Sequence, residues 1–172
     1  MVDQEVFFRE EQRFRQWWIW LIVMGIAVMS WWGFIQQILL KRPFGTNPGP
    51  DWLMWLLLVV FGIGFPLMFL RMKLISEVKQ ASIHIRYWPF VDRDILFTDI
   101  ERYQARTYNA IKEYGGWGVR KWSDSKVAYN ISGNEGVELI LKDGRLVMIG
   151  SQQAENFAQA IAEASGLQQE IV

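Results

Sequence analysis

The sequence predicts an α+β protein in which a transmembrane helical hairpin precedes an antiparallel β-sandwich or barrel capped by a C-terminal α-helix. Three observations support this prediction. Two long apolar runs lie in the first half of the chain, alternating apolar and polar residues fill much of the last hundred, and one amphipathic helical stripe closes it. We therefore expect an interfacial N-terminal helix over 1–16, a hairpin over 17–72 and a folded domain over 73–172.

The composition restricts the chemistry of the chain. Eighteen cations balance eighteen acids, so we expect no nucleic-acid partner. There is no cysteine, which excludes disulfides and cysteine-ligated metals, and His84 is the only histidine. We predict no catalytic residues, no metal site and no cofactor, and hence a protein that is not an enzyme.

The two apolar runs predict two transmembrane spans, at about 17–40 and 52–70. Neither Trp17 to Leu40 nor Trp52 to Leu70 contains a charged residue. At about 1.5 Å per residue they reach roughly 36 Å and 28 Å, which matches a hydrocarbon core of about 30 Å with tilt or interfacial ends. Tryptophans at the outer ends indicate an aromatic belt. Two buried core helices are the alternative. A cleaved signal peptide is not expected, because no small-residue cleavage site follows the first run.

The segment between the spans, Lys41 to Asp51, contains three prolines and two glycines, so it breaks the helix and predicts an antiparallel hairpin. Both termini then share one side. Three arginines precede the first span and three cations follow the second, against two cations in the loop. This asymmetry predicts cytoplasmic termini and a protein of the inner (plasma) membrane.

The residues before the first span predict a short interfacial helix. Glu5–Arg9 and Glu11–Arg15 are i,i+4 pairs in the favourable order, each supporting a helix by about 0.2–0.5 kcal/mol. An irregular apolar stripe accompanies them, formed by Val6, Phe7, Phe14 and Trp17. A frayed terminus is the alternative.

Beyond Lys73 the apolar period changes to two, which predicts strands. Asp143-Gly144 between two of them is the strongest short hairpin signal in the chain. The expected strands lie near Leu74–Lys79, Ser82–Trp88, Asp94–Phe97, Ile100–Tyr108, from about Gly118, Lys126–Ser132, Val137–Lys142 and Arg145–Gly150.

The chain closes with a predicted helix over Gln152–Ser165. Ser151 is the expected N-cap, and Gly166 stands where a left-handed residue would end the helix. The apolar stripe consists of Ala154, Phe157, Ala158, Ile161 and Ala162.

The stretches "YGGWGVR" and "AYNISGNEGVELILKDGRLVMIGSQ", with the helix after them, resemble uncharacterised small bacterial membrane proteins that carry a PH-like domain after two membrane helices. The resemblance covers about Lys73 to Leu167, and the hairpin matches in architecture only. It implies a bent, barrel-like sandwich of two sheets, capped at one end by Gln152–Ser165. It implies no catalytic residues, because PH-like domains are binding and assembly modules.

The stretch "YGGWGVRKW", Tyr114 to Trp122, matches neither the dinucleotide-binding nor the Walker glycine pattern. We expect Gly115, Gly116 and Gly118 to allow positive φ or a bulge where a strand begins, with Trp117 in the core and Arg120 pointing outward. The cations around this stretch define a candidate binding surface, which consists of Lys112, Arg120, Lys121, Trp122 and Lys126.

Two functions fit these expectations. In the first, the hairpin anchors a scaffold or assembly factor whose domain docks a membrane or membrane-associated protein, or a second copy of the chain, by strand addition or helix packing. In the second, the domain senses the membrane surface through weak contact of Arg120, Lys121 and Lys126 with anionic lipid. Fold resemblance does not decide between the two.

Overall fold

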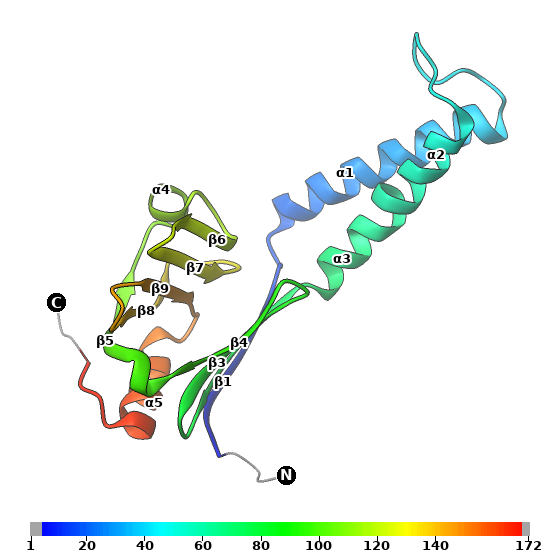
Figure 1. The fold of residues 1–172 in the computed structure, drawn as a ribbon. Coiled ribbons are helices and arrows are strands. Elements are labelled where there is room, and N and C mark those ends of the chain that lie inside the picture. Colours follow the sequence, from blue (N-terminus) through cyan, green and yellow to red (C-terminus); the bar gives the residue numbers. More distant parts are fainter. Residues whose placement is uncertain (1–4, 170–172) are drawn as a thin grey trace. The chain divides into compact units, whose positions relative to one another are not determined.

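The computed structural model describes residues 5–169 and is a mixed α+β structure: one strand, then two long helices, then the other strands of two β-sheets, then a C-terminal helix (Figure 1). Its contacts divide the chain into two compact units. One is Phe14–Met72, and the other joins the residues before Phe14 to the chain from Lys73 onward. The first strand therefore belongs to the same unit as the C-terminal domain, although residues 14–72 separate the two in the sequence.

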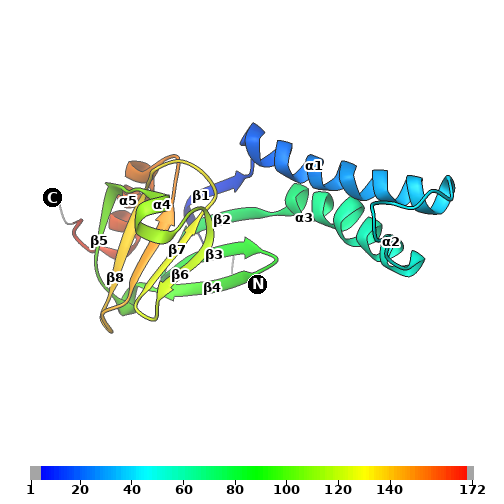
Figure 2. The same cartoon turned by 90° about the horizontal axis from the view of Figure 1, so that it is seen from above.

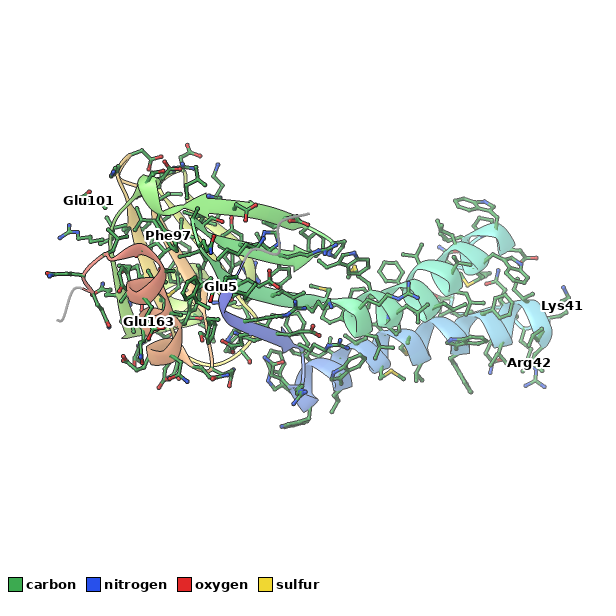
Figure 3. The ribbon with its side chains drawn as sticks, turned by 90° about the horizontal axis from the view of Figure 1, so that it is seen from below. Glu5, Lys41, Arg42, Phe97, Glu101 and Glu163 are labelled. Carbon is green, nitrogen blue, oxygen red and sulfur yellow. The ribbon has the colours of Figure 1, made fainter. Side chains whose placement is uncertain are left out.

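The helical unit contains two helices long and apolar enough to cross a membrane, Trp17–Leu39 and Asp51–Arg71. They coincide with the predicted spans. Lys41 and Arg42 lie in the loop between them (Figure 3). Each helix includes a π-helical stretch, and the segments are α1 (Trp17–Phe34), η1 (Ile35–Leu39), α2 (Asp51–Leu57), η2 (Leu58–Gly64) and α3 (Phe65–Arg71).

Close contacts join the two helices of this unit. The Trp31 indole N–H donates to the Gly62 carbonyl at 3.2 Å, inside the π-helical stretch η2, where the wider turn loosens the regular bonding. A side chain at Gly62 would lie 3.3 Å from the Trp31 ring, so the absence of a side chain here lets the two helices pack closely. At the loop end, Gln37 Nε2 donates to the Gly49 carbonyl and to Asp51.

The first sheet is a four-stranded antiparallel meander in the order β1-β2-β3-β4. Its strands are β1 (Val6–Arg13), β2 (Lys73–Lys79), β3 (Ser82–Trp88) and β4 (Val91–Leu96). The predicted alternation in β3 is confirmed, since Ile83, Ile85 and Tyr87 are fully buried. The outer face is polar: His84 Nδ1 lies at hydrogen-bonding distance from Asp94, 3.0 Å, and Arg86 forms an ion pair with Asp92 at 3.3 Å.

The helix expected over 1–16 is wrong where the structure describes it, because Val6–Arg13 is strand β1; residues 1–4 lie outside the described range. The charges that suggested helical i,i+4 pairs bind across the sheet instead. Arg9 contacts Glu77 at 2.9 Å, and Lys73 contacts Glu11 at 3.2 Å. This segment pairs with β2 along its whole length, so its backbone is hydrogen-bonded in the sheet. The stabilisation that two surface charge pairs would give a helix is too small to outweigh this pairing.

The second sheet has five strands in the order β5-β8-β9-β7-β6. They are β5 (Ile100–Thr107), β6 (Gly118–Ser123), β7 (Lys126–Asn130), β8 (Glu135–Leu141) and β9 (Leu146–Gly150). A 3₁₀ turn, η3 (Phe97–Asp99), joins the sheets, and a short helix, α4 (Ala110–Tyr114), follows β5. The wholly antiparallel sheet that we expected is wrong at one pair, because β7 and β9 run parallel.

The two sheets share no hydrogen-bonded ladder among residues 5–169, and they are not closed into a barrel. Their strands run in clearly different directions (Figure 2). Leu74, Ile83, Leu139 and Ile149 are fully buried side chains of this unit. The domain core therefore includes apolar side chains from both sheets.

The C-terminal helix α5 (Ala154–Ser165) contacts β1 and β2 of one sheet and β5 and β8 of the other, so it closes one end of the sandwich. Phe157 and Ile161 are fully buried as predicted, and Phe157 stacks on Phe8 at 4.9 Å. Gly166 has the predicted left-handed conformation, φ 69°. Ser151 is not the N-cap, since the helix begins later and Gln153 holds that position.

The hairpin at Asp143-Gly144 is confirmed: it joins the antiparallel strands β8 and β9, with Gly144 at φ 81° and Asp143 accepting from the Arg145 N–H at 3.0 Å.

Candidate functional site

The glycine-rich stretch begins as the end of helix α4. Asn109 caps the start of this helix by accepting from the Lys112 N–H at 3.0 Å, and Glu113 accepts from the Asn109 N–H at 2.7 Å. Gly115 ends the helix at φ 72°, where a side chain would be strained. Gly116 and Gly118 also have positive φ, so the predicted conformational role of the three glycines is confirmed.

Strand β6 forms the open edge of the second sheet. It pairs with β7 on one side, and no described strand pairs with its other side. Arg120 and Lys121 are exposed, and Trp122 is 61% exposed. The register shifts between Lys121 and Ser123, as in a β-bulge, which turns Trp122 out of the regular alternation.

The exposed side chains of β6 are held in different ways. Arg120 Nε donates to the Trp117 carbonyl at 2.9 Å, and Lys121 pairs with the exposed Asp124 at 2.7 Å. The predicted outward direction of Arg120 is confirmed. Trp117 is only half-buried; it packs against a small cluster under α4 instead of filling the main core.

Lys126 is the one member of the predicted surface that is partly buried. Its ammonium lies 4.7 Å from the centre of the Tyr114 ring, in a cation–π contact. Tyr114, the last residue of α4, is buried and approaches Glu138 on β8. Lys126 is therefore engaged by the domain, whereas Lys112, Arg120, Lys121 and Trp122 face solvent.

Glu138 and Arg106 form the centre of a polar network beneath this surface. Arg106 makes two bonds to the Glu138 carboxylate, at 3.0 and 2.8 Å, and a third to Glu113 at 2.8 Å. Gln104 Nε2 also donates to Glu138, at 2.9 Å. The Glu138 side chain is 9% exposed, so these partners replace the water that it has lost.

The network sets the ionisation of its members. Burial acts to raise the pKa of Glu138, but the bonds from Arg106 and Gln104 outweigh it and hold that pKa below its ordinary value. The bond from Arg106 likewise lowers the pKa of Glu113, and burial raises the pKa of Tyr114. Glu138 and Glu113 are thus carboxylates at neutral pH, and Tyr114 is a neutral phenol.

An open pocket of about 470 Å³ adjoins α4. Its lining includes Tyr108, Ile111, Glu113 and Trp117, with Gly133 from the β7–β8 turn. Trp117 closes one side by donating from its indole to the Gly133 carbonyl at 3.3 Å. Among residues 5–169, no three His, Asp or Glu side chains cluster closely enough to hold a metal ion.

Sequence reasoning missed the α4 helix, the buried Arg106–Glu138 pair and the role of Glu10. Asn109 and Glu113, four residues apart before a glycine, are the signal that could have revealed α4. Glu10 lies 7% exposed on β1 and accepts from the Ser151 hydroxyl and from the Gln152 N–H at 2.9 Å. Nothing local in the sequence predicts these long-range pairs.

A family model described as a family of unknown function, DUF6141, matches residues 2–167 of the chain. No curated protein matches it. Because the family model covers nearly the whole sequence, including both apolar helices and both sheets, the chain belongs to this family.

Proposed function

We propose that this member of DUF6141 is a non-catalytic, membrane-anchored docking protein. Its two apolar helices would anchor it in a bacterial inner membrane, and its C-terminal unit, a PH-like domain in this proposal, would hold a protein partner at the cytoplasmic face. Two helices of 23 and 21 residues support the anchor. The two-sheet sandwich with a C-terminal helix supports the choice of a binding module over an enzyme, by resemblance of architecture.

The observation that carries the docking proposal is the open edge of β6. An unpaired edge presents backbone N–H and C=O groups, to which an extended segment of another protein can add as a further strand. Trp122, 61% exposed beside this edge, offers a large apolar contact of the kind that dominates binding energy at interfaces.

Charge at the edge favours a different protein over a second copy of the chain. Two β6 strands paired with each other would bring the cations Arg120 and Lys121 of both copies together, which is unfavourable. An extended segment that carries acidic side chains and one apolar side chain would complement this edge. Lys112, exposed on α4, adds a third cation.

The pairing of β1 with β2 supports the membrane topology of the proposal. Arg13 stands opposite Lys73, and the two apolar helices lie between these residues in the chain. A hairpin that leaves and re-enters one sheet requires both of its ends on the same side of the membrane. The excess of cations at that side over the loop favours the cytoplasm.

The experiment is the native mass of the full-length protein, gently extracted from its own membranes. We expect a second polypeptide at fixed ratio, lost in Trp122→Ala and Lys121→Glu. Leu96→Ala is the matched control, since Leu96 is 48% exposed on β4 of the other sheet. Recovery of the wild-type protein alone, or partner retention in both β6 variants, would contradict docking at β6. A homodimer would identify a second copy as the occupant.

Contact with anionic lipid is the second candidate, favoured by three exposed cations on α4 and β6, two of which (Lys112 and Arg120) make no ion pair with any described residue. Each cation near an anionic surface contributes about 1 kcal/mol. Protein held in neutral nanodiscs should then bind anionic vesicles in a salt-sensitive way, and a Lys112, Arg120 and Lys121 triple glutamine variant should not. Absence of wild-type binding would eliminate this candidate.

A further inference from the structure

The turn between β3 and β4 carries exposed aromatic surface that the docking proposal does not use. Phe90 is 59% exposed, and its ring lies 6.4 Å from that of the buried Tyr87. Trp88 is half-buried, and its indole N–H makes no hydrogen bond to any residue in the described range. An aromatic ring with one apolar side and a free N–H suits the boundary between headgroups and hydrocarbon.

The register of the sheet fixes how near this turn lies to the second apolar helix along the chain. Trp88 stands directly opposite Lys73, and α3 ends at Arg71. The path from Arg71 to Phe90 therefore runs two residues along the chain to Lys73, across one strand spacing to Trp88, and two residues further to Phe90. Their Cα atoms are at most about 20 Å apart, whatever the angle between sheet and helix.

The residues beside the turn carry a small excess of positive charge. Arg13, Lys73 and Arg86 share two carboxylates: Arg13 and Lys73 both contact Glu11, at 2.6 and 3.2 Å, and Arg86 contacts Asp92 at 3.3 Å. An aromatic tip beside cations is the combination that peripheral segments use to bind an anionic membrane surface.

We infer that the Trp88–Pro89–Phe90 turn is a third membrane contact, which inserts its aromatic side chains among the headgroups beside the helical hairpin. This inference rests on the membrane anchor of the proposed function. The turn, together with the links from β1 to α1 and from α3 to β2, would hold one end of the sheet at the bilayer surface. Strand β6 belongs to the other sheet and stays available to a partner.

The absence of cysteine in the chain allows a test with single labels. The variants Phe90→Cys, Gln80→Cys and Ile26→Cys, each carrying the same fluorophore, are reconstituted in vesicles of phosphatidylcholine and phosphatidylglycerol. Gln80 is the matched control, because it lies in the exposed turn at the opposite end of β3. Ile26 reports insertion of the first apolar helix. Replacement of the exposed Phe90 leaves the domain core intact.

We expect a lipid-attached quencher to reach the labels at residues 90 and 26, and iodide in the water to reach the label at residue 80. A label at 90 that iodide quenches as well as the label at 80 would overturn the inference while the anchor stands. A label at 90 protected from both quenchers would indicate a protein contact and would also overturn it. If the label at 26 escapes the lipid quencher, the membrane anchor itself fails, and the inference with it.

Discussion

Glu138 is a buried carboxylate whose charge depends on a few donors. Its side chain is 9% exposed, and Arg106, Gln104 and Tyr114 all approach it. Such a pair contributes little compared with an apolar pair of the same shape, but it is costly to break, because the remaining charge stays buried. The network joins β5, β8 and α4, and it supports the helix on which Lys112 lies.

Replacement of the Arg106 guanidinium should therefore destabilise the domain strongly. We expect Arg106→Met to lower the free energy of unfolding by about 3 kcal/mol, because Glu138 loses its bidentate partner. The measurement is urea-dependent proteolysis of the full-length protein in detergent. Arg145→Met, which removes the exposed ion pair with Asp143, is the control and should behave like the wild type. Equal stability of the two variants would show that the buried pair is dispensable.

The same pair predicts how stability depends on pH. The folded-state pKa of Glu138 lies below its ordinary value of 4.5, so its stabilisation is complete above that pH and is lost as the pH falls below it. Wild-type stability should decline as the pH falls below the ordinary value of 4.5, and Glu138→Gln should show a shallower decline in the same urea experiment. Parallel pH profiles for both proteins would contradict the assignment.

At the scale of elements, β1 is the one named strand of the domain that precedes the helical unit in the sequence. Its inward side chains include Glu10 and Gln12, which reach the end of β9 and the start of α5. Gln12 Nε2 donates to the Gly150 carbonyl at 2.8 Å, and Glu10 accepts from Ser151 and Gln152. These bonds fix the N-terminal strand to the far end of the chain.

Removal of the Glu10 carboxylate should loosen that connection. We expect Glu10→Ala to lower the free energy of unfolding by about 1–3 kcal/mol, because the Ser151 hydroxyl and Gln152 N–H lose their acceptor. Hydrogen exchange should rise at the Gln152 N–H, just before α5. Arg9→Ala, on the outer face of the same strand, serves as the control. Unchanged exchange at Gln152 in Glu10→Ala would mean that water replaces the carboxylate without cost.

The elements that sequence reasoning predicted are those whose signals are local. The two apolar helices follow from length and absence of charge, and the β8–β9 hairpin follows from Asp143-Gly144. Helix α5 follows from its apolar stripe and Gly166. Each signal lies within the element itself, so no distant contact was needed to read it.

The elements that were missed depend on distant partners. In β1, two of the inward positions are the polar Glu10 and Gln12, so the strand shows no apolar alternation. The parallel β7–β9 pair is a long-range arrangement without local signal. Proximity in the sequence groups the five residues of the candidate surface. It does not reveal the cation–π contact between Lys126 and the Tyr114 ring, which depends on the fold.

At the scale of the whole molecule, the C-terminal domain is incomplete without the residues before the first helix. A fragment that starts at Lys73 lacks β1, so β2 becomes an open edge of apolar residues such as Ile75. Open edges of this kind promote aggregation. The part of the chain that folds as one unit is therefore discontinuous.

This discontinuity predicts the behaviour of two proteins that lack residues 14–72. Because Arg13 stands opposite Lys73, a short glycine-containing hairpin loop should replace residues 14–72 and join β1 to β2. We expect the joined protein to be monomeric, with dispersed amide resonances in NMR spectra, and fragment 73–172 to aggregate. Size-exclusion chromatography compares them directly. A monomeric, well-folded 73–172 fragment would show that β1 is an accessory strand.

The pairing of β1 with β2 also orders events during synthesis. The ribosome makes β1 first, yet its partner strand appears only after both apolar helices have been made. Until β2 has been made, β1 has no strand to pair with. If only one of the helices crossed the bilayer, β1 and β2 would be left on opposite sides, and the sheet could not assemble. With the proposed membrane anchor, completion of the sheet would require both helices to have inserted, and a chain in which insertion had failed would expose an unpaired edge to the proteases that remove misassembled proteins.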